Sequence, residues 1–197
     1  MVVATDHNTL SSYREMVLEH LFVGEVMRHC WHNQLRRIEM LKSQVDNSGY
    51  DIVLESNAIM RHIQLKSSHI GAATPGVGIN KELAKKPSGC VIWIFFEPQT
   101  LELAHFLWFG RAPGQPLGDL THLKTRRHSK ANAKGIKTER PNIKVLPKAA
   151  FHRLESIEDV TTMLFGPPLE DHQVDVPAIT DIDTRGNVRD DSLISLI

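Results

Sequence analysis

The stretch GYDIVLESNAIMRHIQLKSS, residues 49–68, decides the fold of this chain. Two runs rich in apolar and β-branched residues, YDIVLE and MRHIQLKS, flank the turn-forming SNAI and are typical of a β-hairpin. Pairing them around a four-residue loop sets Asp51 opposite Gln64. Opposed residues share a face of a sheet, and so do residues two apart in one strand. The pattern therefore predicts that Asp51, Gln64 and Lys66 project to one side.

This common face depends on the pairing register of the hairpin. The same register sets Glu55 opposite Met60 and Val53 opposite His62. A slip of one residue would turn the aspartate to the other face, away from the glutamine and the lysine. The pairing register observed in the structure therefore tests the predicted site directly.

The elements around the hairpin predict an α/β fold with a mixed central β-sheet flanked by helices. Helical periodicity and serines at the N-cap position predict a first helix at 11–32. The other expected elements are a strand near 36–41, a short helix over NKELAKK capped by Asn80, strands at 90–97 and 103–110, a late strand at 142–147 and a helix at 156–165. The strand CVIWIFFE has no polar alternation, so we expect both of its faces to be covered.

Length and composition indicate one well-buried domain. A chain of 197 residues supports a single core at 1–165, followed by an acidic segment at 166–197 that we expect to be a tail or an arm. Two cysteines argue against a disulfide framework. The start lacks the features of a signal peptide, and the longest apolar run, CVIWIFF, is too short for a bilayer. We therefore expect a cytoplasmic protein without a membrane partner.

The zero net charge of the chain hides an uneven distribution. Residues 1–165 carry a balance of +5 and residues 166–197 carry −5. Residues 111–153 hold eleven basic residues against two acidic ones. Such a segment is suited to the backbone phosphates of a nucleic acid. The residues expected to make these contacts are Lys130, Lys134, Lys137 and Arg140.

The hairpin residues have the chemistry of a metal site. A carboxylate, a carboxamide oxygen and a backbone carbonyl form an all-oxygen site suited to Mg²⁺ or Mn²⁺. A lysine beside it can hold a phosphate oxygen or help to activate water. Glu25 is the best second carboxylate, because Gly24 before it would let the first helix lie close to the sheet; Glu19 and Glu55 are weaker candidates.

These residues resemble the PD-(D/E)XK nuclease superfamily, which has a restriction endonuclease-like fold of order αβββαβ. The resemblance rests on Glu25 in the first helix, on GYD ending in Asp51, and on the Q-x-K of Gln64 and Lys66 followed by two serines. It covers about residues 11–109 and the late strand. It implies that Asp51, Gln64 and Glu25 bind Mg²⁺ and that Lys66 assists the attacking water. Tyr50 stands in place of the motif proline, and Gln64 replaces the usual acid, which removes a negative charge from the site.

Each site residue also has a plainer interpretation. Asp51 could be a turn residue after Gly49, Gln64 and Lys66 could lie on the solvated face of a hairpin, and Glu25 could pair with Arg28. The basic residues of 111–153 could form an ordinary solvated surface.

Histidines and aromatic residues suggest two further alternatives. His29 and His32 form a helical pair suited to zinc, but no third or fourth ligand is evident. Trp93, Trp108 and Phe109 could stack on bases, although their strand contexts favour core packing.

Two functions from different classes account for these features. The first is Mg²⁺-dependent phosphodiester hydrolysis of DNA by an endonuclease-like enzyme that acts in repair or defence. A homodimer is compatible with this function, but the sequence does not locate an interface. The second is a catalytically inactive nuclease-fold module that binds nucleic acid or protein, since the neutral Gln64 would hold a cation weakly. A third option is that the acidic segment folds over the basic one as an internal mimic of nucleic acid, or acts as a dimer arm.

Overall fold

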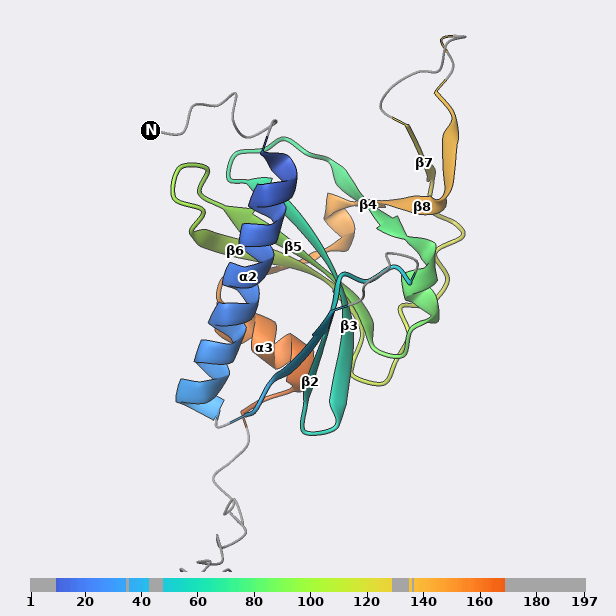
Figure 1. Ribbon diagram of the computed structural model, residues 1–197. Coiled ribbons are helices and arrows are strands. Elements are labelled where there is room, and N and C mark those ends of the chain that lie inside the picture. The colour runs from blue at the N-terminus through green and yellow to red at the C-terminus, as the bar shows by residue number, and fades with distance from the viewer. Residues whose placement is uncertain (1–9, 35, 43–47, 129–134, 136, 169–197) are drawn as a thin grey trace, which may run out of the picture.

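The computed structural model describes residues 10–34, 36–42, 48–128, 135 and 137–168 (Figure 1). Lys130 and Lys134 lie outside the described residues, as does the acidic segment beyond Pro168. In the part of the chain that is described, neither α-helix combines the length and the apolar content needed to cross a membrane.

A six-stranded mixed sheet forms the centre of the molecule, as the sequence predicts (Figure 1). Its strands are β1 (Glu39–Lys42), β2 (Ile52–Ser56), β3 (Ile59–His69), β5 (Gly89–Phe96), β6 (Leu103–Gly110) and β9 (His152–Leu154), in the spatial order β1-β2-β3-β5-β6-β9. The pair β3 and β5 is parallel, and the other neighbouring pairs are antiparallel.

The hairpin of β2 and β3 has the predicted register within its ladder, but the ladder ends at the pair of Ile52 and Ile63, so the predicted pair of Asp51 and Gln64 is not part of it. Glu55 pairs with Met60 and Val53 with His62. The loop, however, is shorter than expected, because the ladder continues to a pair between Ser56 and Ile59. The two residues left in the turn, 57 and 58, have φ angles of 49° and 62°, as in the tight hairpin turns that match the twist of paired strands.

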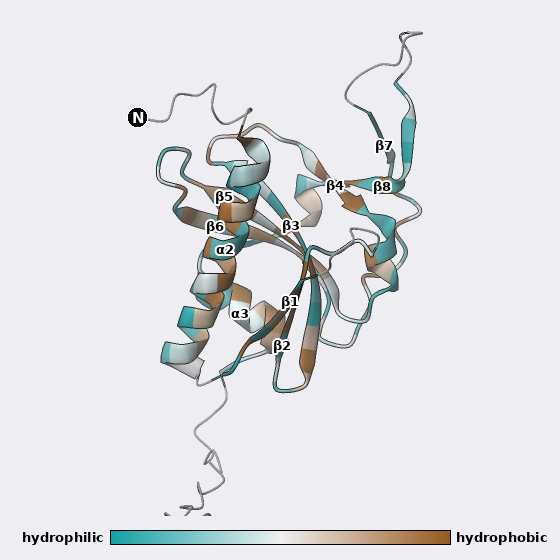
Figure 2. Cartoon of the chain, viewed as in Figure 1, coloured by the Kyte–Doolittle hydropathy of each residue, from teal (hydrophilic) through white to brown (hydrophobic). Residues whose placement is uncertain are grey.

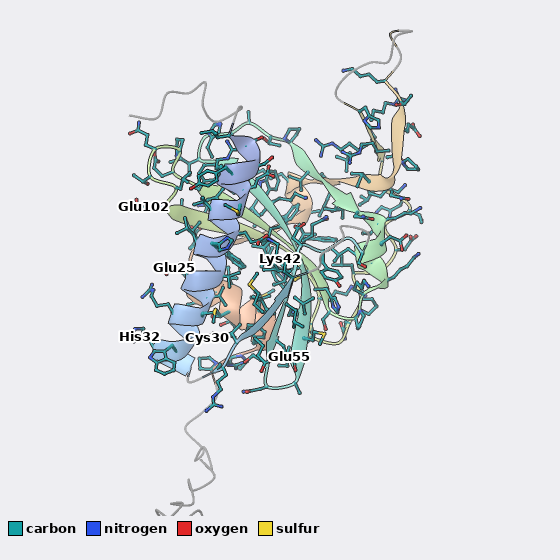
Figure 3. All side chains as sticks on the ribbon, viewed as in Figure 1. Glu25, Cys30, His32, Lys42, Glu55 and Glu102 are labelled. Carbon is teal, nitrogen blue, oxygen red and sulfur yellow. The ribbon has the colours of Figure 1, made fainter. Side chains whose placement is uncertain are left out.

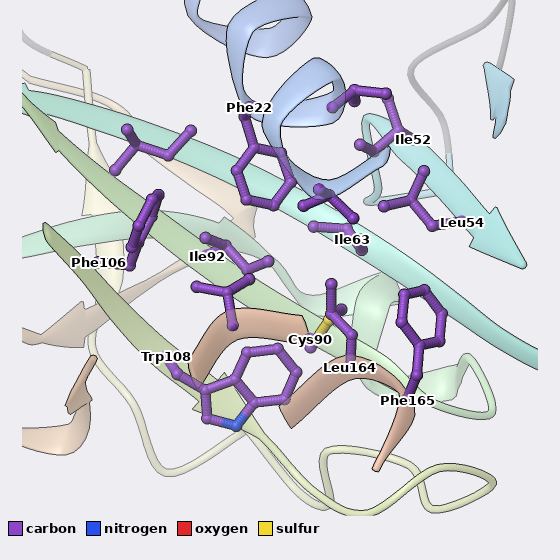
Figure 4. Close-up of a cluster of buried hydrophobic side chains, with 14 of the residues drawn as sticks. Phe22, Ile52, Leu54, Ile63, Cys90, Ile92, Phe106, Trp108, Leu164 and Phe165 are labelled. Carbon is purple, nitrogen blue, oxygen red and sulfur yellow. The ribbon is translucent and has the colours of Figure 1, made fainter. Parts of the chain in front are cut away.

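Strand β5 is covered on both faces, which confirms the expectation from its unbroken apolar sequence. Cys90, Ile92 and Ile94 pack into the core that contains both α-helices (Figure 4). Trp93 and Phe95 are buried on the opposite face. Burial raises the pKa of the Cys90 thiol to about 12.

Two α-helices cover the first of these faces, α2 (Ser11–His29) and α3 (Ile157–Phe165), and a π-helical turn, η1 (Cys30–Gln34), follows α2. Ser156 caps α3 in a capping box with Asp159. The predicted serine cap of α2 is wrong: the helix begins at Ser11, and Leu10 before it offers no side-chain cap.

Gly24 does not bring α2 close to the sheet, contrary to the expectation from the sequence. A Cβ atom built on Gly24 would meet nothing within 4 Å. The contacts with the core come instead from residues such as Phe22 and Val26. The glycine lies about 200° around the helix from Phe22, which turns it away from the sheet.

A small second sheet packs on the opposite face of the central sheet. Its strands are β4 (Gly76–Asn80), β8 (Glu139–Pro147) and β7 (Thr125–Arg127), in the order β4-β8-β7, with the 3-10 helices η2 (Lys81–Lys85) and η3 (Lys148–Ala150) beside it. The predicted helix over NKELAKK is therefore a short 3-10 helix, whose N-cap Asn80 accepts a hydrogen bond from the N–H of Glu82. The late strand belongs to this second sheet rather than to the central one.

Two buried arginines hold the C-terminal end of α3. Arg61 donates to the carbonyls of Met163 and Leu164, and Arg36 donates to the carbonyl of Phe165. The last carbonyls of a helix have no partner within the helix itself. The two guanidinium groups, from β3 and from the segment before β1, satisfy these carbonyls and fix α3 against the sheet.

Candidate active site

Among the described residues, strand β3 has an open edge where the predicted site begins. Its ladder with β2 ends at Ile63, but β3 continues to His69 while paired with β5 on its other side. The N–H of Leu65 faces this open edge and donates to Oδ2 of Asp51 at 2.6 Å. Asp51 itself is tied to the edge through its N–H, which donates to the carbonyl of Ile63 at 2.9 Å. Its carboxylate is therefore held at the point where the two strands separate.

A cleft of about 630 Å³ opens at this edge, between α2, β3, β4 and β7. Asp51 and Lys66 both line it, so the structure brings these two predicted site residues together. The charged residues that line the cleft are Glu15, Glu19, Lys42, Asp51, Lys66 and Arg126. The cleft thus combines three carboxylates with three cationic side chains.

Lys66 is the cation of β3 in this cleft. Among the described residues it forms no ion pair, in contrast to Lys42, which is paired with Glu19. An unpaired ammonium beside a held carboxylate can accept an anionic group such as phosphate.

Gln64 does not line the cleft. Its side chain is buried, and its Oε1 accepts a hydrogen bond from the N–H of Asn80 at 3.1 Å. The oxygen that the sequence analysis assigns to a metal is therefore used to join β3 to the end of β4. The second sheet covers the face of β3 on which Gln64 lies, and this burial keeps the carboxamide out of the cleft.

Glu25 lies away from the cleft, and its placement corrects the predicted site. It forms an ion pair with Arg28 at 2.6 Å, as in the plainer interpretation. Figure 3 shows Glu25 on the side of α2 away from Lys42. Glu15 and Glu19 are four residues apart and share the helix face that borders the cleft, whereas Glu25 is rotated by about 240° from Glu19.

The two weaker carboxylate candidates are placed differently. Glu19 borders the cleft and is bonded to Lys42 of β1. Glu55 pairs with Met60 near the turn of the hairpin, away from Lys42 in Figure 3.

Neither further alternative gains support from the described residues. Within them, no three His, Cys, Asp or Glu side chains form a group that could hold a metal. This applies to His29 and His32 as well as to the cleft. Trp93 and Trp108 are buried in the core, as expected.

Arg126 of β7 is a cleft residue that the sequence analysis does not identify. It reaches the cleft across β4, and a Cβ on Gly78 would lie 2.5 Å from its Nη1. Glycine at 78 therefore leaves the space in which this guanidinium lies. Only the pairing of distant strands brings 126 and 78 together, so local sequence carries no signal for the contact.

Of the residues predicted to contact phosphates, Arg140 lies on a ribbon formed by β7 and β8, and Lys137 lies just before β8. Arg140 is exposed and pairs in register with Arg126, and Lys137 is also exposed. The pairing shifts between Thr125 and Arg126. Irregular pairing of this kind bends a ribbon, and Figure 1 shows β8 turning away from the body of the molecule. The ribbon carries its positive charge outwards.

Comparison with known proteins adds little to this description. No family model and no curated protein sequence matches the chain. Among solved structures, a bacterial homing endonuclease is similar over 56% of this chain and 67% of its own, at 15% identity and a TM-score of 0.26. A similarity this low carries no argument. The fold and the cleft define a mixed α/β protein with a carboxylate and a lysine at an open strand edge.

Proposed function

We propose that this chain is a divalent-metal-dependent phosphodiesterase that cleaves DNA on a restriction endonuclease-like fold. The observation that carries the proposal is the Asp51 carboxylate, held at the open edge of β3 in the same cleft as Lys66. A phosphodiester needs a hard cation and positive charge where negative charge accumulates during hydrolysis. The cleft offers groups for both.

The cleft offers oxygen donors of the kind that Mg²⁺ or Mn²⁺ prefers, although no three His, Cys, Asp or Glu side chains of the described residues are grouped closely enough to hold a metal as they stand. Asp51, Glu19 and Glu15 supply carboxylate oxygens, and the carbonyl of Leu65 faces the same edge as its N–H. Glu19 takes the place proposed for Glu25, and it would have to exchange its bond with Lys42 for the cation. When bound, the cation would supply positive charge to the phosphate.

Lys66 contributes the fixed positive charge of the protein. Its ammonium can hold a phosphate oxygen and stabilise the charge that develops on it. We expect Lys66→Met to lower the rate of plasmid nicking by about 100-fold, the effect of removing one stabilising donor from a transition state. Single-turnover cleavage measures the effect. Lys85→Met is the control, because Lys85 pairs with Glu82 and does not line the cleft; an equal loss in both variants would contradict the assignment.

Arg126 is proposed to contact the DNA backbone, together with Lys137 and Arg140. Arg126→Ala should weaken DNA binding several-fold and reduce the slope of log affinity against log salt by about one, as expected for one lost phosphate contact. Arg153→Ala is the matched control, because Arg153 pairs with Glu155 and lies neither in the cleft nor on the ribbon. Fluorescence anisotropy over a salt series measures both. An unchanged slope for Arg126→Ala would remove it from the interface.

A second candidate function, binding without cleavage, is favoured by the contact of Gln64. Since its oxygen is used by Asn80, and since no three His, Cys, Asp or Glu side chains of the described residues converge, the cation would be held weakly. In that case DNA binding would fall with salt but would not require Mg²⁺.

One experiment separates the two functions. Supercoiled plasmid is incubated with the protein and Mg²⁺ or Mn²⁺, and in parallel with EDTA, while binding is measured under the same conditions. Nicking that requires the cation supports the enzyme. Binding that is unaffected by EDTA, without nicking at any cation concentration, supports the binding module.

A further inference from the structure

An unusual apolar stripe runs along the outer face of α2 and continues onto the π-helical turn η1, which carries Trp31. Its residues recur at intervals of four and three and are Tyr13, Val17, His20, Gly24, Met27 and Trp31. Tyr13 is 62% exposed and Trp31 is 77% exposed, although both are large aromatic side chains. The stripe lies opposite the core residue Phe22 on the helix, where an ordinary surface helix is polar. Figure 2 shows hydrophobic segments between hydrophilic ones on α2.

Gly24 lies near the middle of this stripe. Glycine is the least favourable residue in a helix interior after proline. No contact with the described residues requires it, because a Cβ at this position would meet nothing within 4 Å. A shallow hollow of about 380 Å³ lies beside the glycine, bordered by Met16, His20 and Leu21. None of the described residues covers Gly24, so this part of the stripe can receive a side chain from a second molecule.

We propose that two copies of this chain pair through α2, with the helices antiparallel about a two-fold axis level with Phe22. This arrangement sets Tyr13 opposite Trp31 of the second copy and Val17 opposite its Met27. It also sets the imidazole of His20 in each copy over the hollow at Gly24 of the other copy. Large side chains thus meet where each helix offers space, which is the self-complementarity that a two-fold interface needs.

The charges of the stripe favour a like copy over a charged partner. None of its six residues is an aspartate, glutamate, lysine or arginine. Glu25 and Arg28, at its edge, form an ion pair with each other at 2.6 Å. Two uncharged faces can pack together without burying an unpaired charge, and the second copy provides such a face.

The available area agrees with a reversible dimer. An aromatic side chain buries about 150–250 Å², and a symmetric pair brings four of them together with the exposed Met16, Leu21 and Met27 of each copy. The sum is roughly 1,000 Å², which is the size of a weak, reversible interface and lies just below the range of about 1,200–2,000 Å² for stable complexes. The dimer does not depend on the proposed function, and Glu15 and Glu19 face the cleft on another side of α2.

Sedimentation of the full chain over a range of concentrations tests the proposal. The wild type should change from monomer to dimer as its concentration rises. Met27→Glu should raise the dimer dissociation constant by at least about 30-fold, because it places a charge within the stripe. Met60→Glu is the matched control, since Met60 is 42% exposed and Met27 is 44% exposed, but Met60 lies in the hairpin. A wild type that stays monomeric, or equal effects of the two variants, would overturn the proposal.

Gly24→Ala separates an interface from a structural role. Measured where the chain is monomeric, this variant should raise the midpoint of thermal unfolding by about 2–4 °C, because alanine is the better helix former. It should also raise the dimer dissociation constant about tenfold, because the added methyl group would stand where the His20 ring of the second copy packs. A lower midpoint with unchanged dimerisation would oppose the proposal. Acrylamide quenching of Trp31 adds a check, since Trp93 and Trp108 are buried: a Trp31 shielded in the monomer would mean that the chain covers the stripe itself.

Discussion

Asp51→Asn is expected to abolish cation-dependent DNA cleavage, with a loss of at least about 1,000-fold in rate, while the fold remains intact. Asparagine keeps the shape of the side chain and an oxygen that can accept from the N–H of Leu65. It removes the negative charge that a hard cation needs. Plasmid nicking measures the rate, and titration calorimetry with Mg²⁺ and Mn²⁺ should show that cation binding is lost. Thermal unfolding should change by no more than a few degrees.

Glu25→Gln is the control that tests the corrected site. The sequence resemblance assigns Glu25 to the cation, but in the structure Glu25 pairs with Arg28 and lies outside the cleft. We therefore expect nearly unchanged cleavage in Glu25→Gln and a large loss in Glu19→Gln. Full activity of Asp51→Asn would disprove the proposed site. A loss of activity in Glu25→Gln would restore the assignment made from the sequence.

The sequence predicts the hairpin and its register because both depend on local physical chemistry. Two apolar runs on either side of a short turn-forming segment specify which residues of β2 and β3 face each other, as Val53 and His62 do. Asp51 lies one residue before this ladder, and its place in the cleft depends on its bonds to the edge of β3, at the Leu65 N–H and the Ile63 carbonyl. The turn is harder to predict, because nothing in SNAI requires two residues rather than four.

The other parts of the site depend on contacts between distant segments. Helical periodicity shows that α2 is amphipathic, but it does not show whether Glu19 or Glu25 borders the open edge of β3. Gln64 is placed by the second sheet, whose strands come from two distant parts of the chain. Arg126 reaches the cleft only because β7, β8 and β4 pair in that order. No pattern within a single segment specifies these arrangements.

Arg61→Met is expected to lower the free energy of unfolding by about 3–5 kcal/mol. Arg61 is fully buried and donates to three carbonyls, those of Leu164, Met163 and Arg111, at 2.8, 2.5 and 2.9 Å. Methionine fills a similar volume but leaves these carbonyls without a donor. Each buried polar group that loses its partner costs about 1–3 kcal/mol. Urea denaturation, followed by circular dichroism, measures the change.

The exposed arginines provide the comparison for this effect. Arg153→Met removes a surface ion pair with Glu155 and should change the free energy of unfolding by less than about 1 kcal/mol. Arg61→Lys keeps a positive charge, but a single ammonium cannot follow the planar fork that reaches both α3 and Arg111. We expect this variant to be intermediate. Burial lowers the pKa of the Arg61 guanidinium, because removing the charged group from water costs free energy. The hydrogen bonds to the three carbonyls offset this cost. If Arg61→Met were as stable as the wild type, the end of α3 would be held by Arg36 and apolar packing alone.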